Sequence, residues 1–190
     1  MAEPTLVVGL GNPEMRYARN RHNVGFMVVD RLAARCGEPP FREKARGVLA
    51  RGDLHGRPVL LLKPQTFMNL SGESVQLALQ FFKLSVKSLI VVHDELDVAF
   101  GSTRIKQGGG SAGHNGLKSI TAHCGAEFVR VRVGIAQPGG RRGAEFVLAD
   151  FDTDEYAGLQ GVLDTAADAC ESIIRDGVTT AMNHVNVRRG

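Results

Sequence analysis

The sequence has few of the residues that mark several common classes of protein. Its 190 residues include no tryptophan and only two tyrosines. No apolar run approaches the ~18–20 residues of a membrane span, and the N-terminus lacks the charged-then-apolar pattern of a secretory signal. The three cysteines (Cys36, Cys124 and Cys170) are far apart and odd in number, which argues against a disulfide framework and a cysteine-rich zinc site. These absences favour a cytoplasmic protein that makes no membrane contact.

The length and the apolar content indicate one folded domain. Apolar residues make up 43% of the chain, which is enough for a sizeable core. A chain of this length forms one domain by default, so we expect a single domain over residues 1–190. The sequence shows neither an internal repeat nor a coiled-coil or dimerisation stripe, and we therefore expect a monomer.

The charge is distributed unevenly along the chain. Residues 1–150 hold 20 Lys and Arg against 13 Asp and Glu, whereas residues 151–190 hold 3 against 7. Within Ala99–Gly143, seven basic residues face a single acid, Glu127. A local surplus of this kind suits a polyanion such as nucleic acid, although a solvated basic surface would have the same composition.

Strands and helices are predicted to alternate along the chain. Thr5–Val8 is a short β-branched run that ends at Gly9, and a helical pattern follows from Asn23 to a stop at Gly37. The other predicted elements are a hairpin of Val48–Arg51 with Pro58–Lys63, a helix over Ser71–Lys83 capped by Ser71, a strand over Leu89–His93 followed by an acidic loop Asp94–Asp97, strands over Thr103–Lys106 and Val129–Ile135, a helix near Leu117–His123, and two C-terminal helices divided at Gly177. This alternation predicts an α/β sandwich with a twisted, mostly parallel (mixed) central sheet flanked by helices.

Two of the predicted strands carry basic side chains in alternation with apolar ones. Arg104 and Lys106 lie in one strand, and Arg130 and Arg132 lie in the other. Because a strand alternates its faces with a period of two, each pair projects from one side of its strand.

The stretch GLGNPEMRYARNRHNVG, from Gly9 to Gly25, begins like a dinucleotide-binding turn. Such a turn needs G-x-G-x-x-G between a strand and a helix, so that the backbone can approach a pyrophosphate. Here Glu14 stands at the third glycine position, and Pro13 removes a backbone donor. Gly108–Ser111 is not a phosphate-binding loop either, because no G-K-[ST] follows it.

Nucleophilic and metal-assisted chemistry find little support in the sequence. Neither Ser71 nor Ser111 lies in a G-x-S-x-G motif. The stretch HDELD, from His93 to Asp97, is rich in potential ligands, but neighbouring residues at a strand end point in different directions. We therefore expect no metal site and no cofactor.

His22 is the strongest candidate for chemistry. It lies in a polar stretch after the first strand, and Asp94 follows directly on another apolar strand. Ligands of open α/β sheets gather at the carboxyl ends of the strands, so both side chains can meet at that edge. A carboxylate on one ring nitrogen would leave the other free to take a proton from water. A surface histidine at the start of a helix is the simpler alternative.

Five stretches together resemble the bacterial peptidyl-tRNA hydrolase family. They are GLGNPEMRYARNRHNVG (9–25), KPQTFMNLSG (63–72), HDELD (93–97), GGGSAGHNGLKSI (108–120) and RVRVGI (130–135), in the same order and with similar spacing. The resemblance covers nearly the whole chain. It implies a cofactor-free enzyme that cleaves the ester between a peptide and the 3′ end of tRNA, with peptidyl-tRNA as its partner.

The resemblance also implies roles for individual residues. His22 would be the general base, Asp94 would orient it, and Asn69 would bind near the scissile carbonyl. Asn12 would distinguish a blocked N-terminus from a free one, and Asn115 would help to hold the water or the substrate backbone. The remaining implied contacts are Tyr17, Phe67, Met68 and His114 to the substrate, and Lys106 and Arg132 to a tRNA phosphate. The chain departs from the family pattern at Glu14, Ala99 and Ala136-Gln137.

Two other functions are compatible with parts of the pattern. A non-catalytic RNA-binding relative would need the basic strands but not the base, so the intact set of His22, Asp94, Asn69 and Asn115 favours an enzyme. An esterase acting on small molecules would need the base but would leave the basic strands without a purpose.

Overall fold

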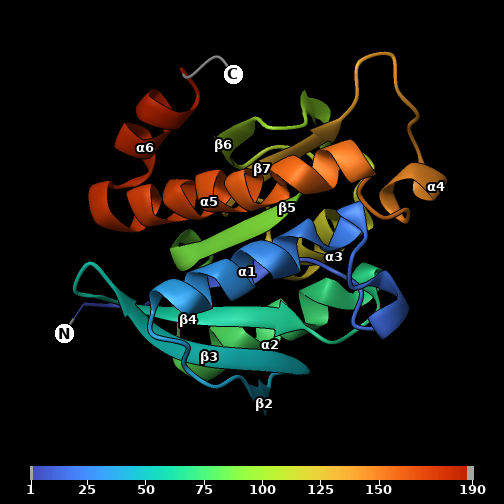
Figure 1. The fold of residues 1–190 in the computed structure, drawn as a ribbon. Helices are drawn as coiled ribbons and strands as arrows, with labels where there is room; N and C mark the ends of the chain where they lie inside the picture. The colour runs from blue at the N-terminus through green and yellow to red at the C-terminus, as the bar shows by residue number, and fades with distance from the viewer. Residues whose placement is uncertain (1, 188–190) are drawn as a thin grey trace.

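The protein is built on a seven-stranded mixed sheet with helices on both faces (Figure 1). The structure is a computed structural model and describes residues 2–187. The order of the strands across the sheet is β2-β3-β4-β1-β5-β7-β6. Their bounds are β1 Thr5–Gly9, β2 Arg42–Lys44, β3 Gly47–Leu54, β4 Arg57–Pro64, β5 Leu89–Ala99, β6 Thr103–Gln107 and β7 Val129–Ala136.

The four central strands are parallel, and the outer strands are antiparallel to their neighbours. β1 pairs in parallel with β4 and β5, and β5 pairs in parallel with β7. β2, β3 and β6 add antiparallel pairings at the two sides. This arrangement confirms the predicted α/β sandwich with a mixed sheet.

The helices form a layer on each face of the sheet. α1 (Val24–Arg35), α5 (Thr153–Asp176) and α6 (Val178–Val185) pack on one face, and α2 (Ser71–Phe82) and α3 (Asn115–Cys124) pack on the other. The remaining helical segments are the short α4 (Ala144–Val147) and the 3-10 turns η1 Met15–Tyr17, η2 Arg21–Asn23, η3 Met68–Leu70 and η4 Val86–Ser88. Among the described residues, no helix has the length and apolar character needed to cross a membrane.

The core is divided by the sheet into two apolar layers. In β1, Val7 packs with α1 and α5, whereas Leu6 and Val8 pack with α2 and α3. A central parallel strand that is covered on both faces is apolar at every position, which explains why Thr5–Val8 has no polar alternation.

The glycines of the first motif allow helix α1 to approach the sheet closely. A Cβ atom on Gly9 would lie 2.1 Å from the carbonyl oxygen of Gly25, and one on Gly25 would lie 2.4 Å from the carbonyl oxygen of Val92. Only glycine leaves room for backbone to pack on backbone at this distance. The glycines therefore bring the start of α1, and η2 before it, against the carboxyl ends of β1 and β5.

Two predicted boundaries were wrong. Asp94–Asp97 is not a loop, because β5 continues to Ala99 and pairs with β7 beyond Asp94, with a bulge between Glu95 and Ala99. Ser71 is not the N-cap of α2: it is the first helical residue, and its hydroxyl donates to the carbonyl oxygen of Met68. In both places, contacts distant from the local pattern decide the boundary.

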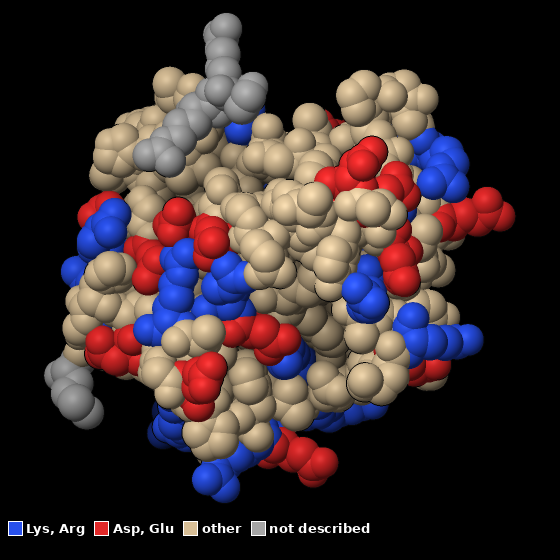
Figure 2. All heavy atoms as spheres, viewed as in Figure 1, with Lys and Arg blue, Asp and Glu red and all other residues tan. Residues whose placement is uncertain are grey.

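Polar contacts hold the C-terminal helices against the rest of the molecule. Arg35 of α1 pairs with Asp164, Asp168 and Glu171 of α5, and basic and acidic side chains are interspersed on this face in Figure 2. After α6, the side-chain amide of Asn186 donates to the carbonyl oxygen of Ile105 (2.9 Å) and accepts from its N–H (2.8 Å). Asn186 thus forms two hydrogen bonds with the backbone of the outer strand β6.

Candidate active site

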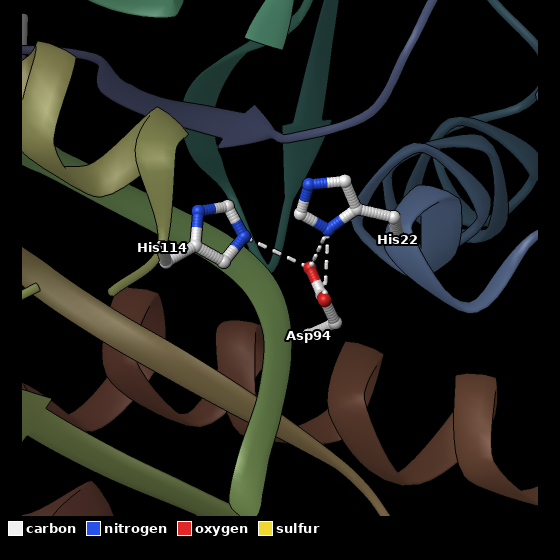
Figure 3. A group of neighbouring side chains, drawn as sticks. All are labelled: His22, Asp94 and His114. Carbon is white, nitrogen blue, oxygen red and sulfur yellow. Dashed lines mark hydrogen bonds and ion pairs between the residues drawn. The ribbon is translucent and has the colours of Figure 1, made fainter. Parts of the chain in front are cut away.

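His22 and Asp94 meet at the carboxyl edge of the sheet, as the strand pattern predicts. η2 carries His22 and β5 carries Asp94, and Nδ1 of His22 lies 2.8 Å and 3.0 Å from the two carboxylate oxygens (Figure 3). The Asp94 side chain is 2% exposed and that of His22 is 13% exposed. The second ring nitrogen of His22 points away from Asp94.

The carboxylate determines which nitrogen of His22 carries the proton. An ionised carboxylate only accepts hydrogen bonds, so Nδ1 of His22 must donate to Asp94. In the neutral ring Nε2 then holds the lone pair. His22 is thereby prepared to accept a proton at Nε2.

His114 donates the second hydrogen bond to the same carboxylate. It is the N-cap of α3, where its Nδ1 accepts from the N–H groups of Gly116 (3.1 Å) and Leu117 (3.4 Å). Because Nδ1 is an acceptor, Nε2 bears the proton, and it donates to Oδ1 of Asp94 over 2.9 Å. Both ring nitrogens of His114 are therefore bonded within the protein, and the ring is largely buried.

These contacts shift the pKa values of the pair in opposite directions. Burial by itself would raise the pKa of Asp94, but His114 and His22 hold it well below its usual range. Burial acts to lower the pKa of His22, but the charge of Asp94 and its hydrogen bond outweigh this effect and raise it. Asp94 is therefore an anion at neutral pH, and His22 is a stronger base than a free histidine.

A cavity of about 470 Å³ lies beside His22 and Asp94. Asn12, Met68, His114 and Asn115 contribute to its lining, so the structure brings these predicted residues close to His22. Ala144, Val147 and Leu148, in and just after α4, also line it; we call these three residues the apolar wall. The cavity thus combines amide groups beside the base with a surface for apolar groups.

Asn23, which the sequence analysis did not single out, holds Asn12 at the cavity. Its Oδ1 accepts from the N–H of Asn12 (2.8 Å), and its Nδ2 donates to the carbonyl oxygen of Asn12 (2.9 Å). Asn23 is buried at the start of α1, next to His22. A polar residue beside a candidate base was the only sequence signal for this contact.

Three predicted substrate contacts lie outside the lining of this cavity. Phe67 is 68% exposed, and Asn69 is also exposed. Both are neighbours of Met68, which does line the cavity. Tyr17 is half-buried in η1, with the guanidinium of Arg16 4.6 Å from the centre of its ring.

A second, basic hollow of about 220 Å³ lies close by and shares Glu95, Asp97 and Ala112 with the cavity lining. Lys106 and Arg132 line it, as expected for neighbouring strands. Lys106 is exposed, whereas Arg132 donates to Oε1 of the buried Glu95 (2.7 Å).

Arg130 is part of the interior. It is 2% exposed, and its guanidinium donates to the carbonyl oxygens of Gly109 and Gly110. It therefore holds the glycine-rich loop that leads to His114. His93 is buried behind the same hollow, and its burial, followed by the influence of His114, lowers its pKa to about 3.

The trio His22, Asp94 and His114 brings three potential metal ligands within 4.8 Å of one another. The hydrogen bonds argue against a metal at this position. His114 accepts two backbone N–H groups at Nδ1, so its Nε2 offers a proton and no lone pair. A metal would need neutral ring nitrogens with free lone pairs, and the trio does not fit one without loss of the α3 cap.

Comparisons with known proteins agree with the site. The sequence profile described as peptidyl-tRNA hydrolase matches residues 6–190. Proteins named peptidyl-tRNA hydrolase are 51% identical in Sorangium cellulosum (96% of this chain, 84% of that protein) and 49% identical in Geobacter sp. strain M21 (96% and 98%). The crystal structure of peptidyl-tRNA hydrolase from Acinetobacter baumannii has a TM-score of 0.90 at 38% identity, covering 100% of this chain and 97% of that one.

The fold and the site define an α/β protein in which a buried carboxylate orients a histidine at the carboxyl edge of the sheet. With the matches over nearly the full length, the family is also defined. The chain belongs to the peptidyl-tRNA hydrolase family.

Proposed function

We propose that this protein hydrolyses the ester bond between peptide and tRNA in peptidyl-tRNA, with His22 as the general base. The observation that carries the proposal is the pairing of Nδ1 of His22 with the buried Asp94, which leaves Nε2 as a proton acceptor pointing away from Asp94. The reaction would recycle tRNA from prematurely released chains.

The proposed reaction needs no covalent intermediate with the protein. Nε2 of His22 takes a proton as a water attacks the ester carbonyl, and the resulting imidazolium is stabilised by Asp94. Asn12 and Asn115 line the cavity, and their side-chain amides are our proposed donors for the oxyanion. Collapse of the tetrahedral intermediate expels the 3′ oxygen of tRNA, which receives the proton from His22. General base catalysis of this kind contributes about 10²–10⁴-fold.

The basic hollow is the proposed site for a tRNA phosphate. Lys106 and Arg132 line the hollow, and in the pairing of β6 with β7 Lys106 lies directly opposite Arg130. The exposed ammonium of Lys106 lies near other basic side chains, and a phosphate anion would be attracted by this local positive charge. Phosphate contacts give affinity without reading sequence, as an enzyme for many tRNAs requires.

The remaining predicted contacts fit a substrate larger than the cavity. Phe67 and Asn69 are exposed on either side of Met68. Asn69 stays a proposed contact near the scissile carbonyl, and we assign Phe67 to the part of the substrate outside the cavity. Tyr17 stays a proposed substrate contact. One chain supplies every residue of the proposed site, so a cytoplasmic monomer is sufficient for the activity.

The test compares an N-acetylated aminoacyl-tRNA with the same aminoacyl-tRNA bearing a free amine. We expect rapid release of tRNA from the blocked substrate only. His22→Ala should abolish release while tRNA binding is retained, and His184→Ala, at an exposed histidine of α6, should behave as wild type. Binding of tRNA without release by the wild-type protein would refute the proposal and favour a non-catalytic RNA-binding relative. Equal cleavage of a small ester would favour a general esterase.

A further inference from the structure

Arg21, the residue before the proposed base His22, has a fully buried side chain. Arg21 is 0% exposed, and its guanidinium makes three hydrogen bonds. Nη2 donates to Oε1 of Glu155 (2.6 Å) and to Oδ1 of Asp152 (3.1 Å), and Nη1 donates to the carbonyl oxygen of Phe146 (3.1 Å). The guanidinium carbon also lies 4.1 Å from the centre of the Phe146 ring.

All of these partners belong to the segment from α4 to the first turn of α5. The backbone follows the same path: the N–H of Arg21 donates to the carbonyl oxygen of Ala149 (3.1 Å), and the amide of Asn20 donates to Asp150 (2.7 Å). This segment includes the apolar wall of the cavity. The residue before His22 is therefore fastened to the chain that forms the wall.

The anchor for Arg21 is itself fixed. Oε1 of Glu155 also accepts from the N–H of Asp152 (2.8 Å), in the capping box that begins α5. Both terminal nitrogens of Arg21 are paired, whereas its buried Nε has no hydrogen-bond partner. The planar guanidinium fork is held in one orientation by the partners of the two terminal nitrogens. The start of the 24-residue helix α5 thus sets the position of Arg21, and through it that of η2.

We propose that Arg21 is a positioning residue for catalysis, which fixes the His22 backbone relative to the apolar wall so that Nε2 meets the substrate held there. This inference rests on the proposed role of His22 as the base. A small displacement of a base from its productive geometry is costly, up to about 10²-fold for 1 Å, while the groups that bind the substrate stay in place. The loss should therefore appear in kcat.

The test compares Arg21→Lys with Arg35→Lys on N-acetylated aminoacyl-tRNA. Lysine keeps the charge but lacks the fork that spans Glu155, Asp152 and Phe146. Arg35 also pairs with acidic residues of α5, yet it lies at the other end of α1 from His22. We expect both variants to lower Tm, whereas only Arg21→Lys lowers kcat, by roughly tenfold, with little change in KM.

Asp152→Asn provides a second variant that keeps the protein folded. The Asp152 side chain is 50% exposed. When the substitution removes the charge of Asp152, Glu155 can still pair with Arg21. We expect a smaller fall in kcat with KM retained. If Arg21→Lys folds, an unchanged kcat in this variant overturns the inference. If Arg21→Lys does not fold, an unchanged kcat in Asp152→Asn overturns it. A variant that raises KM alone also overturns it. Inactivity of the wild-type protein would instead contradict the proposed function.

Discussion

Replacing His114 by alanine or by asparagine separates its two roles. His114 caps α3 through Nδ1 and donates to Asp94 through Nε2. Alanine removes both contacts. Asparagine is among the best N-cap residues and keeps the cap, but its shorter side chain cannot also reach Asp94. The two variants therefore differ mainly by the cap.

The expected losses follow from the two kinds of contact. A hydrogen bond to a charged group contributes about 1.5–3 kcal/mol, and an N-cap about 1 kcal/mol. We therefore expect the free energy of unfolding to fall by about 1.5–3 kcal/mol in His114→Asn and by about 1 kcal/mol more in His114→Ala. Loss of the donor should also raise the pKa of Asp94, because the hydrogen bond from His114 favours the ionised carboxylate.

Urea denaturation at pH 7 measures the losses of stability, and an acid-unfolding titration compares the variants with the wild type at low pH. Asp94 has a folded-state pKa below its unfolded value, so it stabilises the protein above the unfolded pKa, and this contribution is lost as the pH falls through the folded pKa. The variants should therefore lose stability at a higher pH than the wild type. Equal losses in the two variants at pH 7 would refute the capping role. If the variants unfold in acid at the same pH as the wild-type protein, the proposed contribution of the hydrogen bond from His114 to Asp94 is refuted.

Three further changes test other parts of the site. Asp94→Asn removes the charge that raises the pKa of His22 and leaves the burial that lowers it. In a pH–rate series, the acid limb of kcat/KM, below which the base is protonated, should therefore move to a lower pH than in the wild type, and kcat should fall by about 10²-fold or more. Gly25→Ala places a Cβ 2.4 Å from the carbonyl oxygen of Val92 and should lower the free energy of unfolding by about 1–3 kcal/mol, and an unchanged urea midpoint would contradict the close packing of α1. Lys106→Ala should raise KM at constant kcat and reduce the slope of log kcat/KM against log salt by about 1, and a retained slope would remove Lys106 from the phosphate contacts.

The sequence predicts the features that depend on local periodicity. The helical spacing of Val75, Ala78 and Leu79 identifies α2, and the apolar runs identify the central strands. The meeting of His22 with Asp94 follows from one topological rule, because His22 follows the carboxyl end of β1, and Asp94 comes just after Val92, the partner of the last residue of β1 in the neighbouring parallel strand.

The features that the sequence leaves open depend on long-range partners. The acidic run after His93 remains in β5 because Asp94 is bonded by His22 and His114, and Glu95 by Arg132. Strand alternation gives the side on which Arg130 lies, but it cannot show that the glycine-rich loop covers that side. No local pattern identifies His114 as a cap whose other nitrogen reaches Asp94.

The side-chain amide of Asn186 bears on whether the outer strand β6 can pair with a strand of another molecule. β6 is the outermost strand on its side of the sheet, and an outer strand with free N–H and C=O groups can recruit a strand from another molecule. By bonding both backbone groups of Ile105, the side chain of Asn186 occupies the place that an invading strand would take. A single asparagine after the last helix thus occupies the backbone groups through which another strand would pair at Ile105.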